Sequence, residues 1–321
     1  MDNPEILFLR CTHFDPTENE LSRLHESFPL IHLTVKEQDG YSVDDIKRAH
    51  IIAGFPKVGD LRSAGNLRWL QTPSAGVQQY AERSIYAHDK VILTSARGTY
   101  GRQISDHVIA MIIGHNHNLW TYRDQMKQKI WKRYFPLTDI WESTIVIIGF
   151  GDIGSSIAKK AKALDMHVVV VRRESGNIPE YVDEMYTQES LDDLLHRADY
   201  LAVCAASTKE TLNLIDGRRL SELKRGCCVI NVARGNLINE KALIENLESG
   251  HLGGAALDVT ESEPLDVNSP LWTLPNVMIT PHASGLSLSD SPQIVSLFER
   301  NLRLFLEKKA LINSIDFDKK Y

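Results

Sequence analysis

Short runs of apolar, mostly β-branched residues alternate with helical patterns along almost the whole chain. The predicted strands are residues 6–9, 31–35, 51–53, 91–94, 145–148, 168–171, 200–204, 227–232, 255–257 and 277–279. Strands that alternate with helices of this length form βαβ units, in which the strands lie parallel and helices cover the sheet. The alternation therefore predicts an α/β protein.

Two loops interrupt this alternation and divide the chain into two predicted domains. The chain has 321 residues, about twice the ~150 residues of a typical domain. The loops 95–101 and 284–292 flank a central block with six predicted strands, the number in a doubly wound dinucleotide-binding fold. We predict a dinucleotide-binding domain over residues 99–286 and a discontinuous second domain made of residues 1–98 and 287–321.

The charge balance and the cysteines narrow the classes of partner. With 42 acidic and 36 basic side chains the net charge is −6, which gives no general attraction to nucleic acid or anionic lipid. The chain begins without a basic leader, and no run approaches the ~20 apolar residues of a membrane helix. The four cysteines show neither a disulfide framework nor zinc-site spacing. We therefore expect a cytoplasmic protein without a bound metal.

A glycine pattern follows the predicted strand 145–148. Gly149, Gly151 and Gly154 fit GxGxxG, and a helical pattern over 155–164 comes directly after them. In this setting the first glycine permits a tight turn, the second lets a pyrophosphate approach the main chain, and the third lets the helix pack on the strand. The motif predicts a dinucleotide site, and a glycine turn without a ligand is the alternative interpretation.

The next predicted strand, 168–171, is followed by Arg172 and Arg173. An acidic residue at this place accepts hydrogen bonds from the ribose 2′-hydroxyl of NAD, whereas an arginine suits the 2′-phosphate of NADP. The pattern favours NADP. NAD is the second candidate because Glu174 is an acceptor next in the chain, and two exposed arginines that merely end a strand are the alternative interpretation.

Four polar residues follow other predicted strands or stand shortly after them: Arg234, Asp258, Glu263 and His282. The carboxyl ends of parallel strands open on one edge of a sheet, so we expect these side chains to meet at the nicotinamide end of the dinucleotide. A guanidinium can grip a carboxylate, an imidazole can protonate a developing alkoxide, and a carboxylate can keep that imidazole charged. The set is suited to the reduction of a 2-oxo acid.

At these positions the chain resembles the D-2-hydroxyacid dehydrogenase family. The matching segments are GFGDIG at 149–154, NVARG at 231–235, LDVTESEPL at 257–265 and TPHASG at 280–285, with further similarity at 75–77, 98–107 and 313–321. The resemblance implies two doubly wound parallel-sheet domains. One is a Rossmann dinucleotide-binding domain and the other a discontinuous, flavodoxin-like substrate domain.

The resemblance also implies a role for each site residue. Arg234 would bind the substrate carboxylate and polarise the carbonyl, His282 would be the acid/base, and Glu263 would hydrogen-bond His282. Main-chain amides of the other domain would hold the carboxylate across the cleft between the domains, at Ser74, Ala75 and Gly76. Further cofactor contacts are implied at Asp152, Ile153, Ala206, Thr211, Ala233, Asp258, His282 and Gly285.

By resemblance, the protein is a homodimer with the helical pattern 104–120 in its interface, and it reduces a small 2-oxo acid to the D-2-hydroxy acid. NAD-using members usually carry Asp at the position of Arg172, which again points to NADP. The chain has Ala206-Ser-Thr208 where Pro-Leu-Thr is common, and Asp106 where Glu is common. These departures affect the geometry of the cofactor loop. The alternative is a non-enzymatic, dinucleotide-sensing corepressor-like protein of the same fold, and the sequence does not specify which 2-oxo acid is used.

Overall fold

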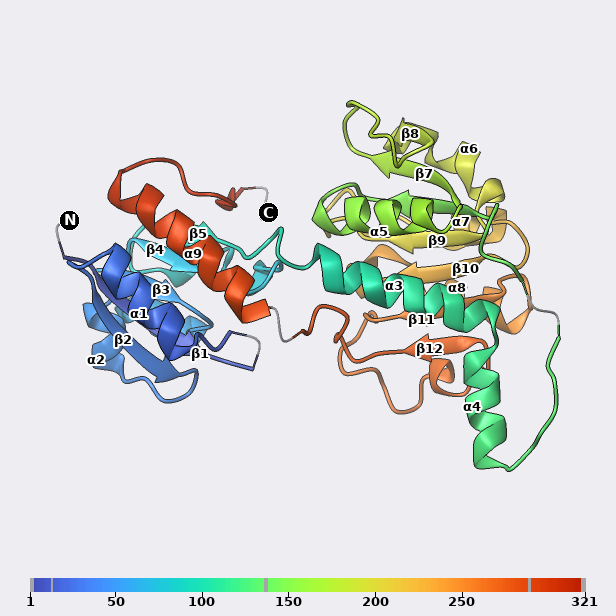
Figure 1. Ribbon diagram of the computed structural model, residues 1–321, viewed down its shortest axis with the longest axis horizontal. Helices are drawn as coiled ribbons and strands as arrows, with labels where there is room; N and C mark the ends of the chain where they lie inside the picture. The colour runs from blue at the N-terminus through green and yellow to red at the C-terminus, as the bar shows by residue number, and fades with distance from the viewer. Residues whose placement is uncertain (1–2, 13, 136–137, 288–289, 319–321) are drawn as a thin grey trace. The chain divides into compact units, whose positions relative to one another are not determined.

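Two parallel β-sheets, one of five strands and one of seven, organise the computed structural model (Figure 1). The structure describes residues 3–12, 14–135, 138–287 and 290–318. The chain separates into two compact units, Met1–Tyr100 with Leu286–Tyr321, and Gly101–Gly285. All strand pairs within both sheets are parallel, so the predicted α/β class is confirmed.

The first unit contains the five-stranded sheet, with strand order β2-β1-β3-β4-β5. This is the order of flavodoxin-like folds. Its α-helices and strands are β1 (Glu5–Arg10), α1 (Glu18–Ser27), β2 (His32–Glu37), α2 (Val43–Arg48), β3 (Ile51–Ala53), β4 (Trp69–Gln71), β5 (Ile92–Thr94) and α9 (Asp290–Leu306). The last helix packs on the sheet through Phe298, whose ring stacks on Trp69 at 5.0 Å between centroids. The C-terminal helix therefore completes the fold of the N-terminal segment.

The second unit contains the seven-stranded sheet, with strand order β12-β11-β10-β9-β6-β7-β8. Its strands are β6 (Thr144–Ile148), β7 (His167–Arg172), β8 (Glu184–Thr187), β9 (Tyr200–Val203), β10 (Cys228–Asn231), β11 (Gly254–Leu257) and β12 (Val277–Ile279). The chain leaves β6 toward β7 and β8 and then crosses to β9 on the other side of β6. The order therefore reverses beside β6, as in the Rossmann fold, and ligands bind at this switch point in such sheets.

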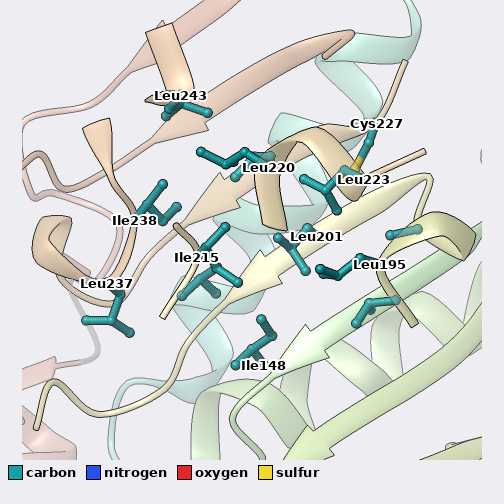
Figure 2. Close-up of a cluster of buried hydrophobic side chains, with 14 of the residues drawn as sticks. Ile148, Leu195, Leu201, Ile215, Leu220, Leu223, Cys227, Leu237, Ile238 and Leu243 are labelled. Atoms are coloured by element: carbon teal, nitrogen blue, oxygen red, sulfur yellow. The ribbon is translucent and has the colours of Figure 1, made fainter. Parts of the chain in front are cut away.

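Helices cover both faces of this sheet. They are α3 (Gly101–Asn116), α4 (Leu119–Lys127), α5 (Asp152–Ala163), α6 (Leu191–Leu194), α7 (Gly217–Glu222) and α8 (Glu240–Glu248). Helices α3 and α5 lie side by side on one face (Figure 1). Figure 2 shows the core on the other face, which includes Ile148 and Leu201 from the sheet and Leu220 and Leu243 from the helices. Since Ile148 directly precedes the glycine turn, the core anchors the loop that begins there.

Short 3₁₀ segments complete the described structure. They are Val58–Ser63, Gln78–Tyr80, Arg83–Ile85, Gln188–Ser190, Leu195–Arg197, Gly235–Leu237 and Pro270–Trp272. Within the described ranges no helix has the length and apolar character needed to cross a membrane. In the same ranges, no group of three or more His, Cys, Asp or Glu side chains is placed to hold a metal ion.

The structure corrects one predicted helix and adds two strands. The helical pattern over 104–120 is not one helix, because α3 ends at Asn116 and α4 starts at Leu119. Asn118 between them has φ 52°, a left-handed conformation that asparagine tolerates better than most residues. A Cβ at Gly114 would lie 2.3 Å from the Trp120 ring, so this glycine makes room for the tryptophan of α4. The added strands are β4 and β8.

Candidate active site

The glycine turn at the carboxyl end of β6 uses its three glycines differently. Gly149 has φ +98°, and a Cβ there would lie 2.8 Å from the Ala205 backbone. A Cβ at Gly154 would lie 2.0 Å from the Gly149 carbonyl oxygen, so the protein's own packing requires both glycines. A Cβ at Gly151, the N-cap of α5, would meet nothing within 4 Å. The open side of the turn therefore lies at the helix N-terminus, where a phosphate can accept hydrogen bonds.

Two side chains, those of Asp152 and Cys204, form hydrogen bonds at this turn. The Asp152 carboxylate accepts a hydrogen bond from the Gly101 N–H at 2.6 Å. The N–H groups of Asp152 and Ile153 lie in the first turn of α5, where N–H groups have no partner within the helix and can bind a ligand. The Cys204 thiol lies 3.2 and 3.1 Å from the carbonyl oxygens of Ile148 and Gly149. Burial raises the pKa of this thiol to about 12, so it stays a protonated donor. Residue type and spacing do not indicate this role for Cys204, which reads as a buried thiol at the end of an apolar run.

Two arginines stand where β7 ends. Arg172 is half-buried, and its Nη1 lies 2.9 Å from the position that a Cβ at Gly176 would occupy, so the guanidinium lies over the following turn. The pKa of Glu210 is lowered, first by a hydrogen bond from Thr208 and further by the nearby charge of Arg173. Positive charge therefore lies between the end of β7 and the loop after β9.

The loop after β9 closes on itself without the proline common in the resembled family. Thr211 Oγ1 donates to the Ala206 carbonyl oxygen at 2.8 Å and accepts from the Thr208 N–H at 2.7 Å. Ser207 Oγ donates to Asn236 Oδ1 at 3.0 Å. The loop is thereby tied to the segment that follows Arg234.

Arg234 follows β10 in a turn that Asn231 shapes. The Asn231 side chain is 1% exposed, accepts from the Ala233 N–H and donates to the Arg234 carbonyl oxygen, both at 3.0 Å. Arg234 Nη1 donates to the Ala233 carbonyl oxygen at 2.6 Å. Burial lowers the pKa of Arg234, and the nearby Glu263 opposes that shift. An arginine keeps its charge in such surroundings, so the site contains a partly desolvated cation. The sequence did not single out Asn231, although an amide side chain at the end of an apolar strand indicates a residue that can shape the following turn.

Asp258 holds the loop that carries His282. Its buried carboxylate accepts from Thr280 Oγ1 at 2.6 Å, from the Ala283 N–H at 2.8 Å, and from both the N–H and the hydroxyl of Ser284. The His282 N–H donates to the Asp258 carbonyl oxygen at 2.8 Å, and His282 has φ +51°. Because these donors surround the carboxylate, they fix the loop and keep His282 in a left-handed conformation.

Glu263 and His282 form a hydrogen-bonded pair whose side chains are both partly exposed to solvent. His282 Nδ1 lies 2.8 Å from Glu263 Oε2, and the two side chains are 47% and 39% exposed. A ring that donates its Nδ1–H to a carboxylate has its tautomer and orientation fixed, which leaves Nε2 for proton exchange. The arrangement can act as a general acid toward a bound carbonyl oxygen.

These groups come from loops at one edge of the seven-stranded sheet. Arg234 follows β10, Glu263 follows β11 and His282 follows β12, while the glycine turn follows β6. All four loops stand at carboxyl ends of parallel strands, so the structure brings these predicted residues to the same edge. Ala233 is buried beside Arg234, and Gly285 is half-buried at the end of the unit.

The other predicted binding segment follows β4 in the first unit. Ser74 Oγ donates to the Gly76 carbonyl oxygen at 2.6 Å, and the Ser74 carbonyl oxygen accepts from the Ala96 N–H at 2.9 Å. Among the residues that the structure describes, no acceptor meets the N–H groups of Ser74, Ala75 and Gly76. Consecutive N–H groups of this kind can bind an anion.

Comparisons with known proteins agree on one family. A family model described as "D-isomer specific 2-hydroxyacid dehydrogenase, NAD binding domain" matches residues 109–284. A glyoxylate reductase of Thermococcus kodakarensis is 28% identical over 295 residues, which cover 90% of this chain and 83% of that protein.

Solved structures show the same likeness over the whole chain. A D-isomer specific 2-hydroxyacid dehydrogenase family protein from Aeromonas salmonicida has a TM-score of 0.86 and 32% identity, covering 98% of this chain and 99% of that one. A D-isomer specific 2-hydroxyacid dehydrogenase from Xanthobacter autotrophicus, in complex with NADPH and MES, has a TM-score of 0.82 and 26% identity, covering 99% of each chain.

Proposed function

Because the chain belongs to the D-isomer specific 2-hydroxyacid dehydrogenase family, we propose that it reduces a small 2-oxo acid to the D-2-hydroxy acid, with NADPH preferred and NADH the second cofactor. The single observation that carries the proposal is the Glu263–His282 pair at the same sheet edge as Arg234 and the glycine turn. A general acid, a fixed cation and a phosphate-binding turn are the parts that this reduction needs.

Each side chain of the site has a proposed task. Arg234 grips the substrate carboxylate with two parallel N–H donors and polarises the carbonyl. His282 donates a proton from Nε2 to the carbonyl oxygen. Glu263 stabilises the charged imidazole before this transfer. The N–H groups of Ser74, Ala75 and Gly76 hold the carboxylate as well. The nicotinamide ring, when bound, supplies the hydride.

We assign the dinucleotide to the predicted domain 99–286, which corresponds to the unit Gly101–Gly285, and the substrate-domain role to residues 1–98 with 287–321. The open side of Gly151 fits a pyrophosphate, and the arginines at the end of β7 fit a 2′-phosphate. The remaining proposed cofactor contacts are Gly149, Asp152, Ile153, Gly154, Ala206, Thr211, Ala233, Asp258, His282 and Gly285. A cytoplasmic location stays a prediction from the sequence.

A homodimer is also part of the proposal, with the residues of α3 and the start of α4 in its interface. Exposed apolar side chains in this segment support it: Ile113 is 37% exposed and Leu119 50%. Met126, at 67% exposed, extends the apolar surface along α4. Such side chains favour burial against a second protein surface.

The reaction is tested by mixing the protein with NADPH and a panel of 2-oxo acids while the absorbance of reduced nicotinamide is followed. Glyoxylate comes first, because the Thermococcus relative is a glyoxylate reductase, followed by hydroxypyruvate, pyruvate and branched and aromatic 2-oxo acids. Consumption of NADPH with one of them is expected. NADPH binding without consumption in any mixture would instead favour the non-enzymatic, dinucleotide-sensing alternative.

The variant Gly151→Val should lose NADPH binding and still fold. Its side chain would occupy the open space proposed for the pyrophosphate, and it meets no protein atom within 4 Å of the Cβ position. A fluorescence titration with NADPH and a thermal melt measure the two effects. The matched control Gly154→Val should destabilise the fold, because its Cβ would lie 2.0 Å from the Gly149 oxygen. Tight binding by Gly151→Val would mean that the glycine loop is only a turn.

The variant Arg172→Asp should reverse a preference for NADPH. A charge-assisted hydrogen bond to the 2′-phosphate contributes about 10- to 100-fold, and an aspartate would repel the phosphate and accept from a 2′-hydroxyl. The ratio of kcat/KM for NADPH and NADH is measured at one fixed salt concentration, since salt screens phosphate contacts.

Arg225→Asp is the control for Arg172→Asp, because it makes the same charge change in the exposed loop that precedes β10, at the other end of the strands. Its preference should equal that of the wild type. A wild type that favours NADH, or an unchanged preference in Arg172→Asp, would refute the role of Arg172.

A further inference from the structure

The turn that carries Glu263 is exposed, yet Glu263 stays 2.8 Å from His282. Residues 261–264 are all exposed, so core packing does not hold the carboxylate in place. Inside the turn, Thr260 Oγ1 donates to the Ser262 carbonyl oxygen at 2.8 Å. This bond shapes the turn but does not attach it to the rest of the unit. Leu265, two residues after Glu263, packs against the core and anchors the end of the turn. The position of the exposed residues before it depends further on contacts that reach the turn from outside.

Two outside contacts are present. A Cβ at Gly235 would lie 2.0 Å from the Thr260 carbonyl carbon, so the segment after Arg234 presses against the start of the turn. On the other side, Glu240 Oε2 accepts a hydrogen bond from the Glu261 N–H at 2.9 Å. Glu240 is the first residue of α8, whose N-cap Asn239 accepts from the Ala242 N–H. The carboxylate of Glu240 thus extends from a capped helix and not from another loop.

We propose that Glu240 is a positioning residue for Glu263, and through it for the His282 imidazole; this inference rests on the proposed function. The bonded Glu261 N–H belongs to the residue two positions before Glu263, so the bond limits how far the turn can swing from His282. Without it, Glu263 would spend less time paired, and the charged imidazole would lose part of its stabilisation. Glu240 is given no contact with either reactant in the proposed function.

The effect of Glu240 on the Glu263–His282 pair can be separated from the effects of the other charged groups near the pair. Two charged groups adjoin the pair or its loop: Arg234, which interacts with Glu263, and the carboxylate of Asp258, which accepts from Ala283 and Ser284. His107 faces the loop of His282 through Thr280, at 3.4 Å. A change at Glu240 alters none of these groups.

The test compares the pH profiles of kcat/KM for 2-oxo acid reduction. Reduction needs protonated His282, so Glu263→Gln should move the high-pH decline of the rate to lower pH. Glu240→Ala should move the decline in the same direction by part of that amount. It should lower kcat about 10-fold, less than the ~10²- to 10⁴-fold cost of losing general acid catalysis in most sites. KM for NADPH should stay unchanged.

Three further variants complete the test. Glu240→Gln keeps an oxygen that accepts from Glu261 and should restore a profile close to the wild type. Glu245→Ala, on the same helix, removes an exposed carboxylate near Lys241 and should change nothing. Glu240→Asp, with a side chain too short to reach the N–H, replaces the alanine variant if a thermal melt shows that alanine disturbs folding.

Each outcome of these experiments supports or overturns the positioning role of Glu240. A Glu240→Ala profile that coincides with the wild type, while Glu263→Gln shifts, overturns the role of Glu240 and leaves the proposed function standing. Equal shifts in Glu240→Gln and Glu240→Ala also overturn it, because the charge of Glu240 and not its hydrogen bond would then matter. A wild type without turnover on any 2-oxo acid overturns the proposed function, and this inference with it.

Discussion

His282→Asn should lower kcat for 2-oxo acid reduction by about 10²- to 10⁴-fold, the usual cost of removing a general acid. The Glu263 carboxylate lies on Nδ1, so Nε2 is the nitrogen that exchanges the proton, and an amide cannot replace it. NADPH binding should fall far less than kcat, since His282 is one of many proposed cofactor contacts and its imidazole acts on the reacting carbonyl and not on the pyrophosphate. Steady-state kinetics and a binding titration measure the two quantities.

Asparagine is the right replacement because of the backbone at this position. His282 has φ +51°, which asparagine tolerates better than most residues, whereas alanine would add about 1 kcal/mol of strain. The hydrogen bonds from the loop to Asp258 should therefore remain in the variant. A thermal melt equal to the wild type checks this, and a wild-type kcat would remove His282 from the role of acid.

Arg234→Lys should lower kcat/KM by about 10- to 100-fold, the effect of losing one charge-assisted hydrogen bond. The planar guanidinium can grip a carboxylate with two parallel bonds, and an ammonium supplies only a point charge. Burial already lowers the pKa of Arg234, and a lysine in the same surroundings loses its proton far more readily. Both a higher KM for the oxo acid and a lower kcat are expected.

The affinity for NADPH is the internal control for Arg234→Lys, because the guanidinium is not proposed to touch the dinucleotide. Folding should be preserved, since the contact of Arg234 Nη1 with the Ala233 carbonyl oxygen is one that an ammonium can also make. Kinetic constants equal to those of the wild type would show that other groups hold the substrate carboxylate, with the amides of Ser74, Ala75 and Gly76 the next to test.

The sequence predicted the strands that read as apolar, β-branched runs and missed β4 and β8. Strands β6 and β7 are buried on both faces of a parallel sheet, and such strands read as continuous apolar runs. The edge strand β8 is half-buried at every residue, so it shows neither a run nor an alternation. The three residues of β4, Trp-Leu-Gln, include no β-branched side chain.

The break between α3 and α4 shows a second limit. Apolar spacing continues through 104–120 because Leu119 and Trp120 of α4 follow the buried apolar residues of α3 at helical spacing, although α4 itself has no buried residue. The periodicity alone therefore predicts one helix. The left-handed Asn118 and the contact between Gly114 and Trp120 end the first helix, and neither can be read from spacing. Local breaks of this kind depend on which side chain a neighbouring turn has to accommodate.

The candidate site was largely predictable because parallel strands end at one edge. That rule predicts from the sequence alone that Arg234, Glu263 and His282 lie at the same edge. It did not reveal Cys204 or Glu240, which form hydrogen bonds with the main chain of other loops, or Asn231, which does so with its own turn. Which main-chain atom such a side chain bonds to depends on how the loops pack in three dimensions. Residue type and spacing carry little information about that packing.

The buried carboxylate of Asp258 has a consequence for how mutagenesis of this enzyme is interpreted. It gathers donors from three residues of one loop, and the same residue's carbonyl oxygen holds the backbone of His282. Any replacement at this position would release the whole loop at once, so a loss of rate would report disorder of the histidine and not a missing reactant. The exposed Glu263–His282 pair carries the proposed proton chemistry, while the alignment of that pair depends on a buried carboxylate behind it.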